Sequence, residues 1–276
     1  MPELPEVETT CHDLVHGGLL HQKITKIIVG WEPMLLSLSA VEFNDSLVGR
    51  SFISLHRRGK YIVFTTDDEQ TLLIHLRMSG SLSLQQLQYT KEKHDHVLFF
   101  LEKSILVFRD MRKFGRCELT DNPASVLSTL GIEPLSTELN GSTLYALFHH
   151  RKSPLKALLL NQSLIAGLGN IYADEALFAS RLHPKRSGSS LTLIESERLA
   201  NSIKEVLTEA LAHRGTSLGD GQGNFISQGK RGEHAVALKV FRKTAAPCPL
   251  CATPIQRIKI AQRSTHFCPA CQPIDP

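Results

Sequence analysis

The chain has 276 residues, more than one domain usually holds, and 42% of them are hydrophobic, which is enough for ordinary cores. No stretch approaches the roughly 18 apolar residues of a membrane helix, and the acidic, proline-containing start is unlike a secretory signal. The net charge of +4 is mildly basic and does not by itself identify a nucleic-acid-binding protein. We expect a cytoplasmic protein of several domains, outside the membrane.

The first elements in chain order are a helix and a series of strands. Residues 3–20 predict a helix, with prolines at its start, acids in its first turn and two glycines at its end. From about residue 23 to residue 119, short β-type runs separated by turns predict an antiparallel sandwich or barrel. The expected strands are Ile24–Val29, Tyr61–Thr66, Thr71–Leu76, His96–Leu101 and Ile105–Arg109.

The second half of the chain has a helical period. Helices are expected over residues 123–130, 142–150, 153–162, 170–180 and 192–213. The stretch 131–141 contains a glycine and a proline without a clear period and is the expected linker. The glycine-rich stretch 215–232 is expected to be a mobile loop.

Four cysteines close the chain as two pairs, Cys248-Pro-Leu-Cys251 and Cys268-Pro-Ala-Cys271. Two such pairs supply four thiolates from two tight turns, which suits a tetrahedral zinc ion. Two disulfides or two redox dithiols are the alternatives, but nothing indicates a secreted protein, and redox pairs are seldom doubled at the end of a chain. We predict one structural zinc in a ribbon. Cys11 and Cys117 are expected to be buried as small hydrophobic residues.

Basic residues gather in two places. Arg50, His56, Arg57, Arg58 and Lys60 stand in a stretch without acids, and the ribbon has three basic residues against one acid. Such patches suit a polyanionic partner, although solvated loops explain them equally well.

The chain begins Met1-Pro2-Glu3-Leu4-Pro5-Glu6. Methionine before a small residue is usually removed, which would leave Pro2 with a free secondary amine. An α-amino group has a pKa of about 8, so such an amine can attack a sugar C1′ and form an iminium, while Glu3 and Glu6 move protons. Taken alone, the same stretch is an ordinary helix start whose acids favour the helix dipole.

Seven short motifs follow one another along the chain. They are Pro2–Glu8, Arg57–Tyr61, His75–Gly80, Lys93–His96, Asp110–Gly115, Gly167–Tyr172 and the cysteine quartet with Ala261–Arg263. In this order they resemble the bacterial formamidopyrimidine-DNA glycosylases, enzymes that excise oxidised purines such as 8-oxoguanine. Each motif is weak alone, but together they cover nearly the whole chain and are very specific.

The resemblance implies an α+β, multidomain fold. It places an N-terminal antiparallel β-sandwich with flanking helices at residues 1–130 and a linker at 131–141. A helix–two-turn–helix domain with a lesion-recognition loop would occupy 142–243, and a zinc ribbon 244–276. It also implies a monomeric glycosylase and AP lyase of base excision repair that binds damaged double-stranded DNA, in the cytoplasm of a bacterium and on the nucleoid when bound to DNA.

The resemblance further assigns roles to residues. Pro2 would be the nucleophile, Glu3 the proton donor and acceptor that opens the deoxyribose, and Glu6 a supporting acid. Lys60 would contact the phosphate beside the lesion.

Three residues would fill the hole left by a flipped nucleotide, namely Met78, Arg112 and Phe114. Outside this resemblance, Met78 and Phe114 are better interpreted as core residues. The other implied DNA contacts are His75, His94, Lys156, Asn170 and Arg263. Asn170 is also an expected helix N-cap. The implied zinc ligands are Cys248, Cys251, Cys268 and Cys271.

Other interpretations stay open. The endonuclease VIII branch of the same superfamily prefers oxidised pyrimidines, but generally starts Pro-Glu-Gly-Pro-Glu, so Leu4 and Phe114 favour the purine branch. A non-catalytic zinc-ribbon DNA-binding protein would need neither Pro2 nor Glu3. A zinc enzyme conflicts with four cysteines, which leave the metal no open position. Residues 228–234 occupy the place of the family's base-recognition loop, and Glu233-His234 replaces an aromatic pair found in some members.

Overall fold

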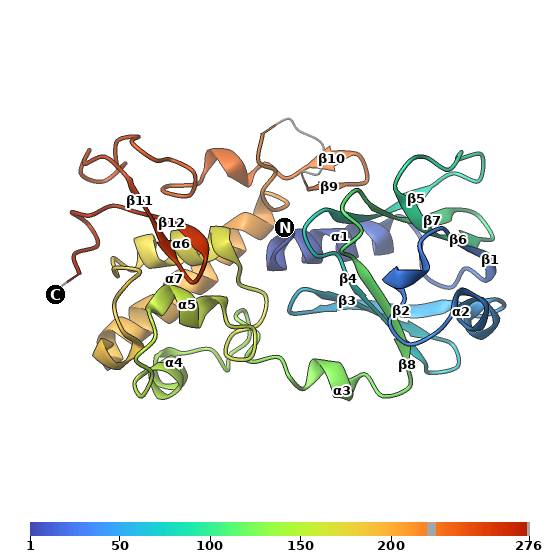
Figure 1. The fold of residues 1–276 in the computed structure, drawn as a ribbon, viewed down its shortest axis with the longest axis horizontal. Coiled ribbons are helices and arrows are strands. Elements are labelled where there is room, and N and C mark those ends of the chain that lie inside the picture. Colours follow the sequence, from blue (N-terminus) through green and yellow to red (C-terminus); the bar gives the residue numbers. More distant parts are fainter. Residues whose placement is uncertain (220–224, 275–276) are drawn as a thin grey trace. The chain divides into compact units, whose positions relative to one another are not determined.

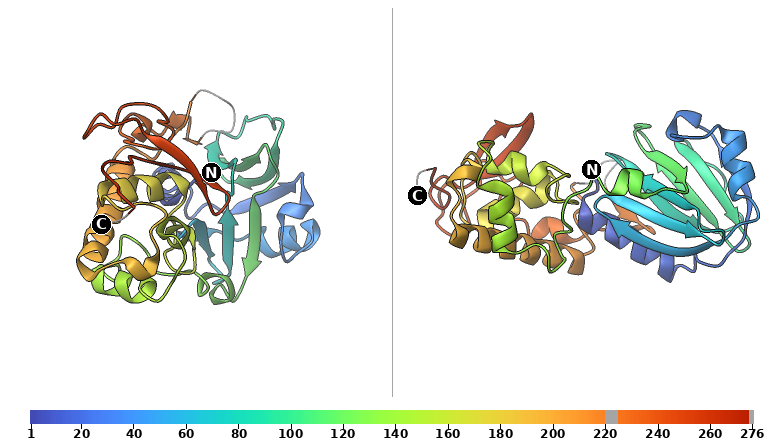
Figure 2. Two further views of the ribbon diagram at one scale, coloured as in Figure 1. Left: turned by 60° about the vertical axis from the view of Figure 1, so that its left-hand side comes forward. Right: turned by 90° about the horizontal axis from the view of Figure 1, so that it is seen from below.

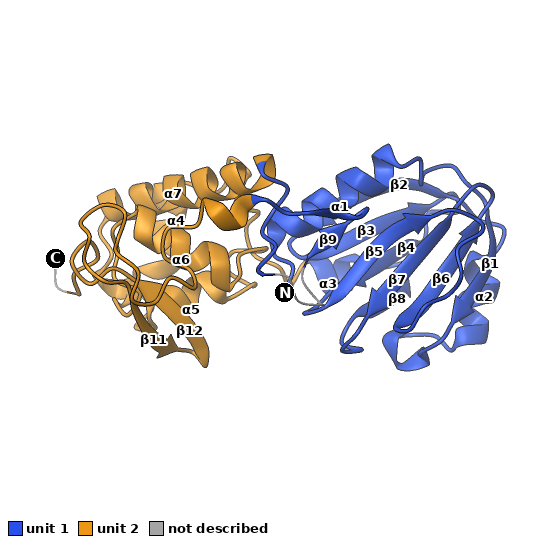
Figure 3. Ribbon diagram, turned by 90° about the horizontal axis from the view of Figure 1, so that it is seen from above, with its two compact units in different colours: residues 1–127, 213–233 blue, residues 128–212, 234–276 orange. Residues whose placement is uncertain are grey.

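The computed structural model describes residues 1–219 and 225–274 (Figure 1). The chain forms two compact units: residues 1–127 with 213–233, and residues 128–212 with 234–276 (Figure 3). Within the described ranges, no helix is both long and apolar enough to cross a membrane.

Unit 1 is built around two antiparallel four-stranded sheets (Figures 1 and 2), one in the order β1-β6-β7-β5 and the other in the order β2-β3-β4-β8. The strands are β1 (Ile24–Val29), β2 (Phe52–Arg58), β3 (Tyr61–Thr66), β4 (Thr71–His75), β5 (Gly80–Gln85), β6 (Asp95–Leu101), β7 (Ile105–Asp110) and β8 (Arg116–Thr120). The predicted antiparallel sandwich is confirmed. The sequence patterns missed β2, β5 and β8, as well as the helix α2 (Ala40–Leu47).

The core of unit 1 lies between the two sheets. The rings of Phe52 and Phe99, one from each sheet, meet edge to face with centroids 6.0 Å apart. The helix α1 (Leu4–His16) lies against β2 and β5, the edge strands of the two sheets. It buries Cys11 and Leu14 in the shared core, in a spacing that keeps them on one helix face. Packing of this kind fixes the start of α1 relative to both sheets.

Unit 2 is mainly helical and ends in a hairpin. Its helices are α4 (Gly141–Phe148), α5 (Leu155–Leu160), α6 (Asn170–Ala179) and α7 (Leu193–Ala212). The hairpin consists of β11 (Gln256–Ile260) and β12 (Arg263–Phe267). The short helix α3 (Ala124–Leu127) belongs to unit 1 and ends its first segment. Helix α6 packs against α5, α7 and β12 and is buried on nearly every side. Such a helix forms the centre of its domain.

The segment 213–233, which we predicted as part of the helical domain, lies in compact unit 1. Within this unit Arg214 and Thr216 bind Asp13 and Glu6 of α1. The expected loop also contains a short hairpin, β9 (Ile226–Ser227) and β10 (Lys230–Arg231). Residues 220–224 of that loop lie outside the described residues. The predicted domain boundaries stay predictions.

Candidate functional site

The start of α1 holds the chain next to Pro2 in place. Pro2 is buried, and Glu3 is only 2% exposed. The Glu6 carboxylate accepts the Glu3 backbone N–H through Oε2, at 2.7 Å, and the Thr216 backbone N–H through Oε1, also at 2.7 Å. Since Glu6 is itself 1% exposed, one buried carboxylate joins the N-terminus to the segment 213–233 within unit 1.

Gly215 is required at this junction. Its φ of +80° is one that L side chains rarely adopt, and a Cβ there would lie 2.6 Å from Glu6 Oε1. Any larger residue would push the Glu6 carboxylate aside.

Lys60 and His75 belong to neighbouring parts of the second sheet. Lys60 is buried in the turn between β2 and β3, and the ring of the next residue, Tyr61, lies edge to face on His75 at 4.8 Å. Burial, followed by the charges of Arg77 and Lys60, lowers the pKa of His75 to about 3. His75 Nδ1 lies 3.0 Å from the backbone N–H of Arg77 and accepts it. The ring is therefore neutral, with its hydrogen on Nε2, where it is available as a donor without charge.

The basic cluster at residues 50–60 is partly neutralised. The Arg57 guanidinium binds Glu8 at 2.6 Å, and Arg50 binds Asp68 at 3.0 Å. Both acids lie outside the acid-free stretch in sequence, so the sequence could not show these pairs.

The residues predicted to fill the hole left by a flipped base lie in two loops. Met78 follows β4 and is 38% exposed, while Phe114 follows β7 and is 44% exposed. The guanidinium of Arg112 lies 4.8 Å from the centre of the Phe114 ring. Neither Met78 nor Phe114 is a core residue. Both loops contact the buried carboxylate of Asp110. The backbone N–H of Asp110 donates to the carbonyl oxygen of His94 at 3.0 Å.

In unit 2 the structure brings Asn170 next to the tip of the β11–β12 hairpin. Asn170 was predicted to be the N-cap of α6, but Gly169 takes that position. The Asn170 side chain donates instead to the Ser264 carbonyl oxygen of the hairpin at 3.0 Å. Within the described ranges its buried Oδ1 has no hydrogen-bond partner. Arg263, next to Ser264, is exposed. Asn170 and Arg263 therefore share one surface.

Arg263 stands at the end of a tight turn. The two turn residues, Ala261 and Gln262, both have positive φ, 47° and 60°, as a two-residue type I′ turn requires. Neither residue is a glycine, and such backbone conformations persist where the surrounding structure holds them.

Lys156 does not lie on the surface. It is 0% exposed, and its Nζ donates to Asp174 Oδ1 at 2.5 Å and to the Asn170 carbonyl oxygen at 2.8 Å. This geometry does not support the predicted direct contact with DNA. Lys156 instead supports the helix start that presents Asn170.

Two acids of α6 were missed by sequence reasoning. Asp174 Oδ2 accepts the backbone N–H of His266 at 2.9 Å, and also contacts its Nδ1 at 3.1 Å. Glu175 accepts three backbone N–H groups, those of residues 239–241, and burial raises its pKa. Two adjacent acids in an otherwise apolar helix could have indicated these contacts, because acids that become buried need hydrogen-bond or charge partners.

The cysteine quartet has the geometry of a zinc site. The Sγ atoms of Cys248 and Cys271 are 3.8 Å apart, those of Cys251 and Cys268 3.5 Å, and those of Cys251 and Cys271 3.4 Å. Zn–S bonds of about 2.3 Å place tetrahedral sulfurs about 3.8 Å apart. Backbone N–H groups of Leu250 and Cys271 also point at Cys248 and Cys268 Sγ. Four thiolates fit one structural zinc, and Cys11 and Cys117 are buried elsewhere, as predicted.

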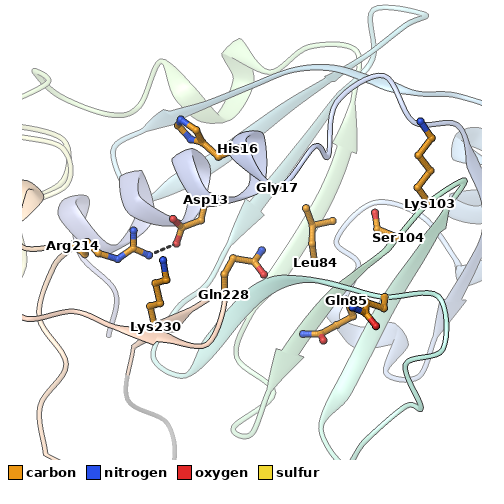
Figure 4. A pocket seen from close by; sticks show the side chains of 11 residues that line it. Asp13, His16, Gly17, Leu84, Gln85, Lys103, Ser104, Arg214, Gln228 and Lys230 are labelled. Atoms are coloured by element: carbon orange, nitrogen blue, oxygen red, sulfur yellow. Dashed lines mark hydrogen bonds and ion pairs between the residues drawn. The ribbon is translucent and has the colours of Figure 1, made fainter.

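A cavity of about 460 Å³ in unit 1 lies beside α1 and the segment 213–233 (Figure 4). Its lining includes Asp13, Arg214, Gln228 and Lys230, and Arg214 is bound to Asp13 at 2.6 Å. In the described part of the chain, Arg214 Nε and Gln228 Nε2 are buried without a hydrogen-bond partner. The lining includes Gln228 and Lys230 of the predicted base-recognition loop but none of the predicted catalytic residues, so this cavity is not the catalytic centre we predicted.

Models of known families match three consecutive parts of the chain. The formamidopyrimidine-DNA glycosylase N-terminal domain matches residues 1–117, and the H2TH domain of the same enzymes matches residues 130–221. A zinc finger found in FPG and IleRS matches residues 246–274.

Whole proteins match along their full length. The formamidopyrimidine-DNA glycosylase of Protochlamydia amoebophila is 40% identical over 274 residues, 99% of each chain. That of Chloroflexus aurantiacus is 41% identical over 276 residues, covering 99% of this chain and 98% of its own. Among solved structures, the Lactococcus lactis Fpg in complex with abasic-site DNA has a TM-score of 0.90 and 36% identity, covering 98% of this chain and 99% of its own. A complex of the LlFpg protein with a THF-DNA and an inhibitor has a TM-score of 0.91 and 36% identity, covering 99% of this chain and 100% of its own.

Proposed function

The chain belongs to the formamidopyrimidine-DNA glycosylase family and is a DNA glycosylase of base excision repair, and on that premise we propose how its own residues excise an oxidised purine and cut the strand. AP lyase activity is a known feature of this family. The partner is damaged double-stranded DNA, and we propose that the protein acts as a monomer in the bacterial cytoplasm, on the nucleoid when bound to DNA.

The observation that carries this proposal is the fixed N-terminus of α1. Glu6 holds the backbone N–H of Glu3 at 2.7 Å, and Glu3 is itself buried. The residue before it, Pro2, is thereby held at one place relative to both sheets. A positioned nucleophile needs a fixed backbone next to it, because catalysis depends on reacting atoms being held in line.

The proposed chemistry starts once Met1 has been removed. The lone pair of the Pro2 nitrogen attacks C1′ of the damaged nucleotide, the bond to the base breaks, and the base leaves with a proton. Glu3 protonates O4′ so that the sugar ring opens to an iminium, because a carboxyl group can act as both acid and base in one site. Loss of a C2′ proton then expels the 3′ phosphate (β-elimination), and a second elimination expels the 5′ phosphate (δ-elimination).

The proposed DNA contacts come from both units. Lys60, His75 and His94 of unit 1 contact the backbone near the lesion, with His75 donating through its neutral ring. Asn170 and Arg263 of unit 2 contact phosphates from the surface they share. Lys156 acts indirectly, through Asn170 and Asp174.

The zinc ion supplies structure only. The four thiolates would hold it by linking the turn before β11 to the turn after β12, and four such ligands would leave no open coordination position for chemistry. The cysteines therefore set where the hairpin presents Arg263.

We also propose the functional division 1–130, 131–141, 142–243 and 244–276, with the amendment that the segment 213–233 packs on α1.

A panel of duplexes tests the proposal. Each duplex carries one lesion, either 8-oxoguanine, a formamidopyrimidine or an oxidised pyrimidine. We expect base release and cutting on both sides of the lost nucleoside, fastest for the two purine lesions. Faster release of the oxidised pyrimidine would favour the endonuclease VIII interpretation, and binding without release of any base would favour a non-catalytic DNA-binding protein.

A further inference from the structure

Asp110 is a buried acid that lies outside the proposed catalytic residues and DNA contacts. It ends β7, is 0% exposed, and has a carboxylate that accepts four hydrogen bonds. Oδ1 accepts the Ser79 hydroxyl at 2.5 Å and the Arg112 backbone N–H at 3.1 Å. Oδ2 accepts the backbone N–H groups of Phe114 and Gly115, each at 2.7 Å. Such a set satisfies nearly every lone pair of an ionised carboxylate.

These four donors come from two different loops. Ser79 directly follows Met78 in the loop between β4 and β5, whereas the other three donors lie in the loop between β7 and β8. The backbone N–H of Arg112 also lies 3.3 Å from the Ser79 hydroxyl. One carboxylate therefore joins the loop of Met78 to the loop of Arg112 and Phe114.

Both loops have an unusual backbone just before the exposed side chain. Arg77, before Met78, has a φ of 54°, and Lys113, before Phe114, has a φ of 58°. Residues other than glycine adopt such angles when the surrounding structure holds them. Two of the donors to Asp110 are Ser79, the residue after Met78, and the backbone N–H of Phe114. These hydrogen bonds are therefore placed to hold the backbone turns at Arg77 and Lys113.

We propose that Asp110 is a positioning residue for duplex opening, which holds Met78, Arg112 and Phe114 in one arrangement so that they enter the hole left by a flipped nucleotide together. This inference rests on the proposed function. Met78 and Phe114 are partly exposed apolar side chains, and packing alone does not fix them. The hydrogen bonds to Asp110 define the relative position of these side chains. The two loops therefore need not become ordered when the side chains enter the DNA, and the free energy cost of that ordering is avoided.

The discriminating change is Asp110→Asn, because the amide has nearly the same shape. Its oxygen can still accept from Ser79 and Arg112, but its NH₂ group then faces the N–H groups of Phe114 and Gly115 and cannot accept from them. Asp95→Asn is a matched control in the same sheet. Asp95 is 2% exposed and accepts from Tyr89, Glu92 and Arg109, without a contact to either loop.

Two substrates separate positioning from general damage. The first is a duplex with 8-oxoguanine, which requires flipping and hole filling, and the second is a single-stranded oligonucleotide with an abasic site, which requires neither. We expect Asp110→Asn to lower the duplex excision rate about tenfold or more, since small displacements of positioning groups cost up to ~10²-fold. Covalent trapping on the single strand should stay close to that of the unchanged protein. For Asp95→Asn the ratio of the two rates should be unchanged.

Equal loss on both substrates, or no loss on either, would overturn the inference. If Asp110→Asn does not fold, Ser79→Ala provides the test, because it removes one of the four hydrogen bonds to the Asp110 carboxylate. It should lower only the duplex excision rate, and by a smaller factor. An unchanged ratio of the duplex rate to the single-strand trapping rate in Ser79→Ala would also overturn the inference. Failure of the unchanged protein to be trapped on any substrate would instead reject the proposed function.

Discussion

Glu6 and Thr216 are joined by a hydrogen bond of 2.7 Å, although 210 positions separate them in sequence. The second oxygen of the same carboxylate holds the backbone of Glu3. The proposed catalytic N-terminus and the segment 213–233 therefore both bind one buried side chain.

Replacing Glu6 by glutamine should disturb both ends of this connection. Its NH₂ group would face one of the two N–H groups that now donate to the carboxylate, and a buried donor left unsatisfied costs about 1–3 kcal/mol. We expect slower single-turnover base release and a lower melting temperature. Glu42→Gln is the control, because Glu42 accepts the equivalent backbone bond at the start of α2 but is exposed. Equal rates for the two variants would contradict the role assigned to Glu6.

Lys156→Met should destabilise the protein strongly. It leaves Asp174 as an uncompensated charge at 0% exposure, and breaking a buried ion pair in this way costs about 3–5 kcal/mol. The melting temperature should fall far more than for Lys152→Met, which removes an exposed lysine. Adding Asp174→Asn should recover part of the loss, because no lone charge remains and the amide oxygen still accepts from His266. No recovery in the double variant would contradict this explanation.

Removing zinc should abolish DNA binding. The four cysteines fix the hairpin that carries Arg263, and structural zinc sites contribute folding energy directly. Chelation, or Cys248→Ser, should therefore abolish binding to a duplex with an abasic-site analogue, and readded zinc should restore binding after chelation. Cys117→Ala is the control, because that thiol is buried outside the quartet. Normal duplex binding by the chelated protein would show that the ribbon does not have this role.

His75 should make the protein less stable in acid. Its pKa falls from 6.5 to about 3 on folding, so between these values the unfolded chain binds one more proton than the folded one. Stability therefore rises with pH across this window and is lost as the pH falls from about 6.5 towards 3. In His75→Gln the melting temperature should fall less steeply with acid, whereas exposed His21→Gln should follow the unchanged protein. Parallel pH profiles for all three proteins would contradict a neutral His75.

The sequence predicted most of the fold where its patterns were periodic. Strands β1 and β3 have the predicted bounds. Helix α6 ends one residue before its predicted end, and α7 is one residue shorter than predicted at each end. Strand β5, Gly80–Gln85, was missed although its residues alternate, because only two of its six residues, Leu82 and Leu84, have apolar side chains. The hairpin at residues 226–231 was hidden by glycine-rich composition.

The site was predictable only where one motif carried it. The cysteine spacing alone indicated the zinc site, and family motifs indicated Pro2, Glu3 and the exposed loop residues. Burial could not be predicted, so Lys156 was placed on the DNA although its charge is paired inside unit 2. The bonds of Asp110 and Asp174 link loops or elements remote in sequence, and no local pattern announces such contacts.

Borohydride trapping tests most directly whether the amine of Pro2 is the nucleophile. A duplex with 8-oxoguanine opposite cytosine is incubated with the protein under borohydride, and the N-terminus of the same preparation is analysed by mass spectrometry. We predict a covalent adduct at Pro2 in molecules that have lost Met1, and none in molecules that retain it. Absence of any adduct on purine and pyrimidine lesions, with Pro2 shown to be free, would contradict the account.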